Sequence, residues 1–303
     1  MDRIILYFRD MAHIAIIGVG AIGGVTAALL AKTGRHRITL CTRRPLEQLT
    51  VTSTEGKTVL CLENFIDPAM APAADWVLVA TKVYDSKDAA VWLRKLRGKD
   101  TPVVTLQNGV EQRENFSAYA DPGLIVPVIV DVPAERRDHG VIVQRGPMRM
   151  QMENTPLGNE FAGLLQGSGA EVSLTDDWLT AAWRKLCLNA AGAVCALVMK
   201  PAGVLQDEAL GQVVLDIVAE CVAVGKAEGA RLDEGFGQQI LDRFRAQPPD
   251  SINSILADRL AGRPMEFDAR NGVMVRKGQK HGIPTPVNQM VVALLGAMGQ
   301  GAG

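Results

Sequence analysis

Three closely spaced glycines form the clearest chemical pattern in this sequence. The segment Gly18-Val19-Gly20-Ala21-Ile22-Gly23 has the form GxGxxG, and it stands between an apolar run at 13–18 and an Ala/Leu-rich segment at 21–32. Between a strand and a helix, the first glycine permits a tight turn, the second lets a pyrophosphate approach the backbone, and the third lets the helix pack closely. Free N–H groups at the helix start favour phosphate. The segment therefore predicts a dinucleotide site, with a βα turn that binds nothing as the alternative.

The next expected strand, at 37–41, indicates which dinucleotide is bound. It is followed by Thr42-Arg43-Arg44, without the acidic residue that usually binds the ribose 2′-OH of NAD. A guanidinium group suits a 2′-phosphate because it can bind phosphate in a bidentate manner. We therefore predict NADPH as the cofactor and Arg43 as the better candidate for its 2′-phosphate. A solvated basic pair is the alternative.

Two polar segments follow later expected strands, at 76–80 and 103–106. They contain Lys82 and Asn108. Ligands of open α/β sheets bind beyond the carboxyl ends of the strands. Lys82 is thus a candidate for meeting negative charge on cofactor or substrate, and Asn108 for hydrogen bonding to the nicotinamide ribose or a substrate hydroxyl. A surface lysine and an ordinary Asn-Gly turn remain open as alternatives.

The strongest catalytic candidate lies in an apolar segment, 177–199, that is expected to form a buried helix. Lys185 and Asn189 are four residues apart there and share one helix face. Lysine is rarely buried without a partner. A lysine beside an amide therefore suits a residue that binds substrate or donates a proton. The alternative is that Lys185 extends into solvent beside Arg184.

Three polar residues follow near an expected helix at 252–262: Ser254, Asp258 and Glu266. Either carboxylate could neutralise a buried lysine. Each is equally typical of a helix surface or a first helical turn. Spacing alone does not bring any of the three to Lys185.

The elements that must position these residues fall into two regions. Up to residue 176, strands alternate with helices, which is typical of a doubly wound parallel sheet. A hairpin is expected at 50–54 and 58–62, and the sheet is expected to be extended by antiparallel strands at 124–130, 141–144 and 148–152. Beyond it, helices are expected at 177–199, 206–229, 234–245, 252–262, 265–280 and 287–298.

The sequence thus predicts an α/β fold in three parts. Residues 1–10 form an extension before Met11, residues 11–176 a Rossmann-type NADP-binding domain, and residues 177–303 an all-helical domain for substrate and catalysis. The apolar helix at 206–229 is interpreted as core, with a homodimer interface as the weaker alternative.

Composition narrows the class of protein. The chain has 303 residues with 32 basic and 33 acidic side chains, a balance that favours neither nucleic acid nor an anionic membrane. No run of ~18 uninterrupted apolar residues occurs, so no transmembrane helix is expected. The 5 cysteines and 4 histidines are scattered, which fits reduced thiols in the cytoplasm without disulfides or a metal site.

Taken together, six segments resemble the ketopantoate reductase (2-dehydropantoate 2-reductase) family. They are GVGAIG, TKVYDS, LQNGVEQ, RKLCLNAA, INSILADRLAGRPMEFDARNG and HGIPTPVN, and they occur in the family's order over almost the whole chain. The resemblance implies a Rossmann domain followed by a helical domain, and NADPH-dependent reduction of 2-dehydropantoate to pantoate, a step toward coenzyme A.

The resemblance also implies roles for individual residues. Lys185 would be the general acid, Asn189 and Ser254 would bind substrate, and Glu266 would lie near the lysine and the cofactor. Asn108 would touch both cofactor and substrate, Lys82 would lie at the cofactor crevice, and Arg43 stands where the family often has its 2′-phosphate arginine.

One position departs from the family pattern. Ala193 stands where the family usually has a second substrate-binding asparagine. Reduction of a different 2-oxo acid, or oxidation of a 3-hydroxy acid, therefore remains an alternative on the same scaffold. A non-catalytic NADPH-binding protein is an alternative of another class.

Overall fold

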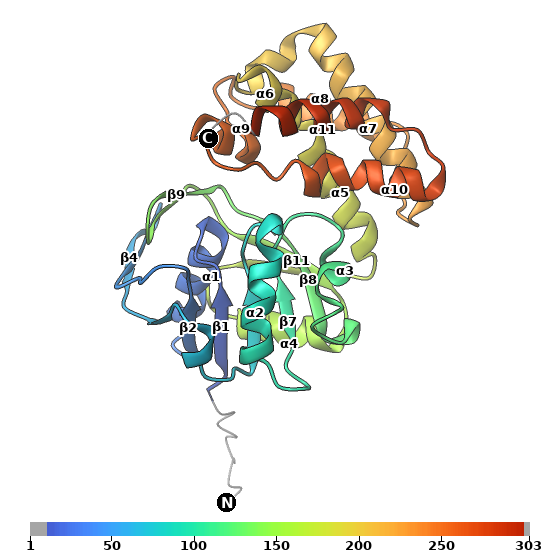
Figure 1. The fold of residues 1–303 in the computed structure, drawn as a ribbon. Helices are drawn as coiled ribbons and strands as arrows, with labels where there is room; N and C mark the ends of the chain where they lie inside the picture. Colours follow the sequence, from blue (N-terminus) through green and yellow to red (C-terminus); the bar gives the residue numbers. More distant parts are fainter. Residues whose placement is uncertain (1–10, 300–303) are drawn as a thin grey trace, which may run out of the picture. The chain divides into compact units, whose positions relative to one another are not determined.

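The computed structural model describes residues 11–299, so the extension expected at 1–10 lies outside the described residues. The chain forms two compact units, which Figure 1 colours in sequence order. The first comprises the described residues up to 107 together with 112–176. The second comprises 108–111 and the chain from 177 onward. The short segment 108–111 falls inside the range expected for the first domain but belongs by its contacts to the second unit.

The first unit is built on an eight-stranded sheet in the order β12-β11-β8-β7-β6-β1-β2-β5. Neighbouring strands are parallel except where β11 runs antiparallel to β8. The bounds are β1 (His13–Ile17), β2 (Arg37–Cys41), β5 (Glu63–Phe65), β6 (Trp76–Val79), β7 (Val103–Thr105), β8 (Ile125–Asp131), β11 (Arg149–Glu153) and β12 (Glu171–Thr175). The expected antiparallel pairing is confirmed between β8 and β11, the strands predicted at 124–130 and 148–152, whereas β8 itself joins the sheet in parallel with β7.

Both faces of this sheet are covered by helices. Along β1, Ile14 and Ile16 enter one apolar core while Ala15 and Ile17 enter the other. A strand buried on both faces requires such a continuous apolar run. Helices α1 (Ala21–Lys32) and α4 (Pro156–Leu164) contribute to the first core, and α2 (Ser86–Leu96) and α3 (Gln112–Phe116) to the second. The three short turns η1 (Pro68–Met70), η2 (Val83–Asp85) and η3 (Pro122–Leu124) connect these elements.

A second sheet of four strands has the order β4-β3-β10-β9. Its bounds are β3 (Leu49–Ser53), β4 (Gly56–Leu60), β9 (Ala134–Asp138) and β10 (Val141–Gln144). The hairpin β3–β4 is confirmed within two residues at each end. The expectation that 141–144 extends the main sheet is wrong, since β10 pairs in parallel with β3. The reason is burial: Ile142 is fully buried and packs against Gly24 of α1.

The second unit is helical. Its elements are α5 (Trp178–Ala191), α6 (Ala193–Val198), η4 (Ala202–Gln206), α7 (Glu208–Ala227), α8 (Phe236–Arg245), α9 (Ser254–Leu260), η5 (Asp268–Gly272), α10 (Val273–His281) and α11 (Pro286–Gly299). The single helix expected at 177–199 is interrupted at Gly192. The helix expected at 265–280 begins as the π-helical turn η5. The α/β class followed by helices is confirmed.

Two apolar parts of the second unit, one face of α7 and the stretch Trp178–Val198, are mostly buried within the protein. In α7, Val214, Ile217 and Val218 are fully buried, so this face forms core within the unit. The stretch Trp178–Val198 is long and apolar enough to cross a membrane by length and composition, yet most of its apolar window is buried in the protein. Core helices of soluble proteins have the same property. Within residues 11–299, no group of three or more His, Cys, Asp or Glu side chains is arranged to hold a metal.

Candidate active site

The glycine turn of the first unit has the geometry of a phosphate cradle. Gly18 has a φ of +91°, and a Cβ there would lie 2.8 Å from Thr81 Cγ2. A Cβ on Gly23 would lie 2.0 Å from the Gly18 carbonyl oxygen, so this position must be glycine for α1 to pack against β1. At Gly20, by contrast, nothing in the described part of the chain lies within 4 Å of a Cβ.

The helix start at this turn is open to an anion. Gly20 is the N-cap of α1, and no side chain among the described residues caps it. The first N–H groups of a helix lack partners within the helix and carry partial positive charge. The open space over Gly20 and the uncapped helix therefore fit the pyrophosphate of a dinucleotide.

Gln107 connects the ends of two neighbouring strands beside the cradle. Its Nε2 lies 3.1 Å from Thr81 Oγ1 and 3.2 Å from the Lys82 carbonyl oxygen, both just beyond β6. It also contacts Ser86 at the start of α2. The buried amide thereby fixes the backbone of Lys82, whose side chain is half-buried. Gln107 lies in the segment LQNGVEQ, but no role was predicted for it from the sequence.

Arg43 is held by two carboxylates in the first unit. Its Nη2 lies 2.5 Å from Asp85 Oδ1 and 2.9 Å from Asp88 Oδ2. The hydrogen bond with Asp85 is the main reason that the pKa of Arg43 is raised. The guanidinium is largely exposed, so it remains reachable by a phosphate. A 2′-phosphate binding there would replace these carboxylates as its anionic partner.

Removing this guanidinium is expected to weaken the preference for NADPH. In an Arg43→Ala variant, kcat/KM for NADPH should fall by about tenfold or more, because a charge-assisted hydrogen bond is worth ~1.5–3 kcal/mol. Its kcat/KM for NADH should stay near the wild-type value. Steady-state kinetics with both cofactors measures the ratio, and Arg44→Ala is the matched control. Equal use of both cofactors by the wild type would contradict the assignment.

Helix α5 of the second unit carries Lys185 and Asn189 on one face. Both side chains are partly buried, while the helix is otherwise packed into the core. The neighbouring Arg184 is engaged elsewhere: it lies 3.1 Å from Asp233 and 5.0 Å from the ring centre of Phe236. Lys185 therefore does not form a common solvent-exposed basic patch with Arg184. Among residues 11–299 the Asn189 side chain has no hydrogen-bond partner, so its amide can bind a ligand.

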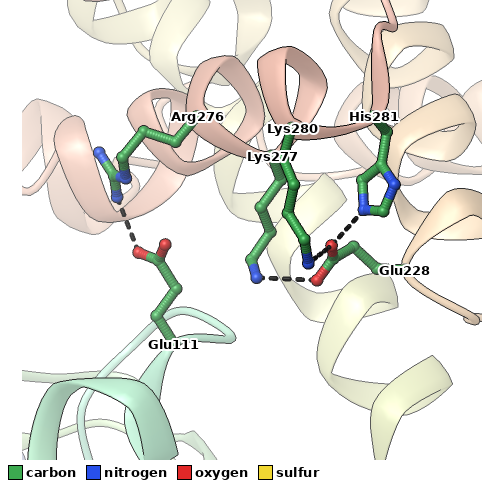
Figure 2. A network of polar contacts seen from close by, with 6 residues as sticks. All are labelled: Glu111, Glu228, Arg276, Lys277, Lys280 and His281. Atoms are coloured by element: carbon green, nitrogen blue, oxygen red, sulfur yellow. Dashed lines mark hydrogen bonds and ion pairs between the residues drawn. The ribbon is translucent and has the colours of Figure 1, made fainter.

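A second part of the candidate site combines residues that are far apart in sequence. Asn108 Nδ2 lies 3.4 Å from Glu266 Oε2, and Glu266 is only 4% exposed. The segment 108–111 is also attached through Glu111, whose carboxylate lies 2.7 Å from Arg276 of α10, as Figure 2 shows. Asn108 thus has a fixed position within the second unit.

Ser254 begins α9 and is exposed. Its Oγ accepts a hydrogen bond of 2.9 Å from Arg270 Nη2, a residue that the sequence reasoning did not single out. Asp258, the other carboxylate considered as a lysine partner, has its Oδ1 2.9 Å from Arg263 Nε. The joint role of Ser254 and Lys185 is a prediction.

The far end of α10 is fixed by a separate ion cluster. Glu228, which follows α7, contacts Lys277 and Lys280, each at 2.8 Å, and also His281 (Figure 2). These contacts lower the pKa of Glu228 to about 2 although burial opposes the shift. The cluster joins α7 to α10, the helix that continues from η5. It therefore supports the segment that carries Glu266 and Arg270 without containing any candidate site residue.

Comparison with known proteins identifies the family. The model described as Ketopantoate reductase PanE/ApbA matches residues 14–156, and the model of its C-terminal part matches residues 177–299. A protein of Caulobacter vibrioides named 2-dehydropantoate 2-reductase is 47% identical over 95% of this chain and 99% of its own. This chain belongs to the ketopantoate reductase family. The resemblance inferred from the six sequence segments is thereby confirmed.

Other members of the ketopantoate reductase family give the same result. A 2-dehydropantoate 2-reductase of Mycobacterium tuberculosis is 36% identical over 96% of this chain and 99% of its own. The crystal structure of a PanE/ApbA family ketopantoate reductase from Ralstonia eutropha aligns with a TM-score of 0.87 and 29% identity, over 95% of this chain and 98% of that one. The fold is therefore that of a ketopantoate reductase over nearly its full length.

Proposed function

We propose that this protein reduces 2-dehydropantoate to pantoate with NADPH. The observation that carries the proposal is the near full-length similarity to proteins named 2-dehydropantoate 2-reductase. The uncapped start of α1 and the exposed guanidinium of Arg43 support NADPH as the cofactor. The reaction makes the protein an oxidoreductase that works on a small anionic substrate.

The proposed chemistry needs one proton from the protein. Bound NADPH supplies a hydride to the ketone carbon of the substrate. Lys185 stabilises the negative charge that develops on the ketone oxygen and donates a proton from its Nζ to that oxygen, so that a hydroxyl forms. Glu266 is the buried carboxylate proposed to orient this lysine. The lysine regains its proton from solvent after product release.

The remaining site residues are proposed to orient the 2-oxo acid. Asn189 has no side-chain hydrogen bond among the described residues, Ser254 is exposed at the start of α9, and Asn108 contacts Glu266. Misplacement of a reacting group by ~1 Å can cost ~10²-fold in rate. Rigid attachment of these side chains is therefore as important to the rate as the proton donor.

A panel of 2-oxo acids tests the proposed reaction. With NADPH in excess, kcat/KM for 2-dehydropantoate should exceed that for pyruvate, 2-oxobutyrate, 2-oxoisovalerate and benzoylformate. Of these acids only 2-dehydropantoate has a hydroxyl group besides its 2-oxo acid group, so only it can use every proposed polar contact. Absorbance of NADPH measures the turnover, and NADH in the same assay tests the cofactor. A higher kcat/KM for another acid would replace the substrate while leaving the reaction class intact. Turnover with none of them would overturn the proposal.

A second candidate substrate class rests on Ala193. This residue begins α6 and is fully buried, so it offers no polar group where the family usually has an asparagine. A different 2-oxo acid, or a 3-hydroxy acid in the oxidative direction, would suit a site with one fewer amide. A non-catalytic NADPH-binding role is disfavoured by the retention of Lys185, Asn189, Ser254 and Glu266 together.

We also propose a cytoplasmic location and a homodimer. All five cysteines are free thiols, and four of them are buried, as in proteins of a reducing compartment. The homodimer is supported by the structural similarity to a protein described as a dimeric ketopantoate reductase from Staphylococcus aureus.

A further inference from the structure

Arg270 places a positive charge in the interior of the second unit. Its side chain is only 2% exposed. Burial lowers the pKa of Arg270, while Glu266 and Asp258 raise it. A guanidinium nevertheless stays protonated in proteins. The site segment therefore contains a permanent buried cation that neither the glycine cradle nor the proposed proton transfer requires.

The contact between Arg270 and Ser254 determines which way the serine hydroxyl can act. Arg270 Nη2 lies 2.9 Å from Ser254 Oγ. A guanidinium has donors only, so the serine oxygen must be the acceptor in this hydrogen bond. The serine proton then has to point elsewhere. Because Ser254 is exposed, a ligand at the start of α9 can accept that proton.

The guanidinium also has an unused donor. Arg270 Nε is buried and has no hydrogen-bond partner among residues 11–299. Buried N–H groups are nearly always paired, and exceptions call for an explanation. Arg270 is also part of the π-helical turn η5, and such turns are frequent at functional sites. Both observations point to a functional role rather than a purely structural one.

Two asparagines attach this arrangement to α5. Asn271 Nδ2 lies 3.3 Å from the Ala190 carbonyl oxygen, and Asn253 Nδ2 lies 2.9 Å from the Gly192 carbonyl oxygen. The first joins η5 to α5, and the second joins the cap of α9 to the end of α5. Ser254 and Arg270 are thus held against the helix that carries Lys185 and Asn189.

We propose that Arg270 is a positioning residue that makes Ser254 a hydrogen-bond donor to the carboxylate of the 2-oxo acid substrate. By occupying the acceptor side of the hydroxyl, it prevents Ser254 from turning its proton inward. A donor toward an anion forms a stronger hydrogen bond than one toward a neutral group. The pair therefore selects acids over neutral ketones. This inference rests on the proposed reduction of a 2-oxo acid.

A double-mutant cycle with an acid and a neutral substrate tests the inference. The variants are Arg270→Met, Arg270→Lys, Ser254→Ala and Arg270→Met with Ser254→Ala, and the substrates are 2-dehydropantoate and its neutral amide. In Arg270→Met the KM for the acid should rise by about tenfold, since a hydrogen bond to a charged group is lost. Its kcat, and the KM or inhibition constant of the amide, should stay near wild type.

The other variants separate positioning from a structural role. Ser254→Ala should match Arg270→Met, and the double variant should be no worse than either, because both remove one shared interaction. Arg270→Lys keeps a cationic donor and should recover part of the acid affinity. The Kd for NADPH, followed by its fluorescence, should be unchanged in all four variants. If Arg270→Met does not fold, Arg270→Lys and Ser254→Ala carry the comparison.

Three results would overturn the inference. They are additive effects of the two residues, an equal loss for acid and amide, and a wild-type KM for the acid in Arg270→Met. The wild-type enzyme separates this question from the proposed function. If it reduces no 2-oxo acid, the proposed function fails, and calorimetric binding of pantoate to the same variants still decides whether Arg270 and Ser254 recognise a carboxylate together.

Discussion

Replacing Lys185 by alanine is expected to lower kcat for 2-dehydropantoate by about 10²- to 10⁴-fold, the usual contribution of a positioned acid or base. The variant loses both the positive charge beside the developing oxyanion and the proton that completes the hydroxyl. The Kd for NADPH should stay near wild type, since the glycine cradle lies in the other unit. Steady-state turnover and a fluorescence titration of NADPH measure the two quantities separately.

The neighbouring arginine provides the control for this experiment. Arg184 precedes Lys185 in α5 but contacts Asp233 and Phe236. Arg184→Ala removes a positive charge from the same helix turn and should leave kcat within about twofold, as is usual for exposed ion pairs. Turnover of Lys185→Ala near that of the wild type would remove the lysine from the reaction.

Replacing Glu266 by glutamine is expected to have the second-largest effect. The carboxylate is buried and contacts Asn108, and its charge opposes the lowering of the Arg270 pKa that burial causes. Loss of that charge leaves cationic groups less compensated and frees Asn108 to shift. We expect kcat/KM to fall by about 10- to 100-fold, because a displacement of ~1 Å can cost that much. Steady-state kinetics on 2-dehydropantoate measures the change.

Asp268 offers a matched carboxylate two residues away. It is exposed and pairs with Arg276 at 2.7 Å. Asp268→Asn removes the same charge from the same segment, and it should leave kcat/KM nearly unchanged. If Glu266→Gln and Asp268→Asn lower kcat/KM equally, the loss follows from removing any negative charge in this segment. The assignment of Glu266 to the site is then wrong.

Local patterns in the sequence were sufficient for the cofactor-binding elements. The strand β1, the glycine turn and α1 are consecutive, and each is determined by residues within a few positions of one another. The bounds expected for α1 and β2 agree with the structure. Parallel pairing of β10 with β3 was not predictable in the same way, because it depends on Ile142 packing over α1 from more than a hundred residues away.

Site residues that are close together in the sequence were predictable, whereas contacts between distant residues were not. Lys185 and Asn189 could be placed on one helix face from their spacing alone. The contact of Asn108 with Glu266 bridges 158 positions, and no periodic pattern encodes it. Arg270 was missed because it reads as an ordinary helix charge between Asp268 and Lys277. A signal did exist, because Arg270 is followed by the uncharged residues Asn271-Gly272-Val273-Met274.

The short segment 108–111 limits how this protein can be divided by recombinant expression. It emerges from a strand of the first unit, yet Asn108 contacts Glu266 and Glu111 contacts Arg276 in the second. A fragment starting at residue 177 would therefore lack two of the groups that complete its own polar contacts. A cut at the apparent domain boundary would therefore separate Asn108 and Glu111 from Glu266 and Arg276, the residues with which they share polar contacts.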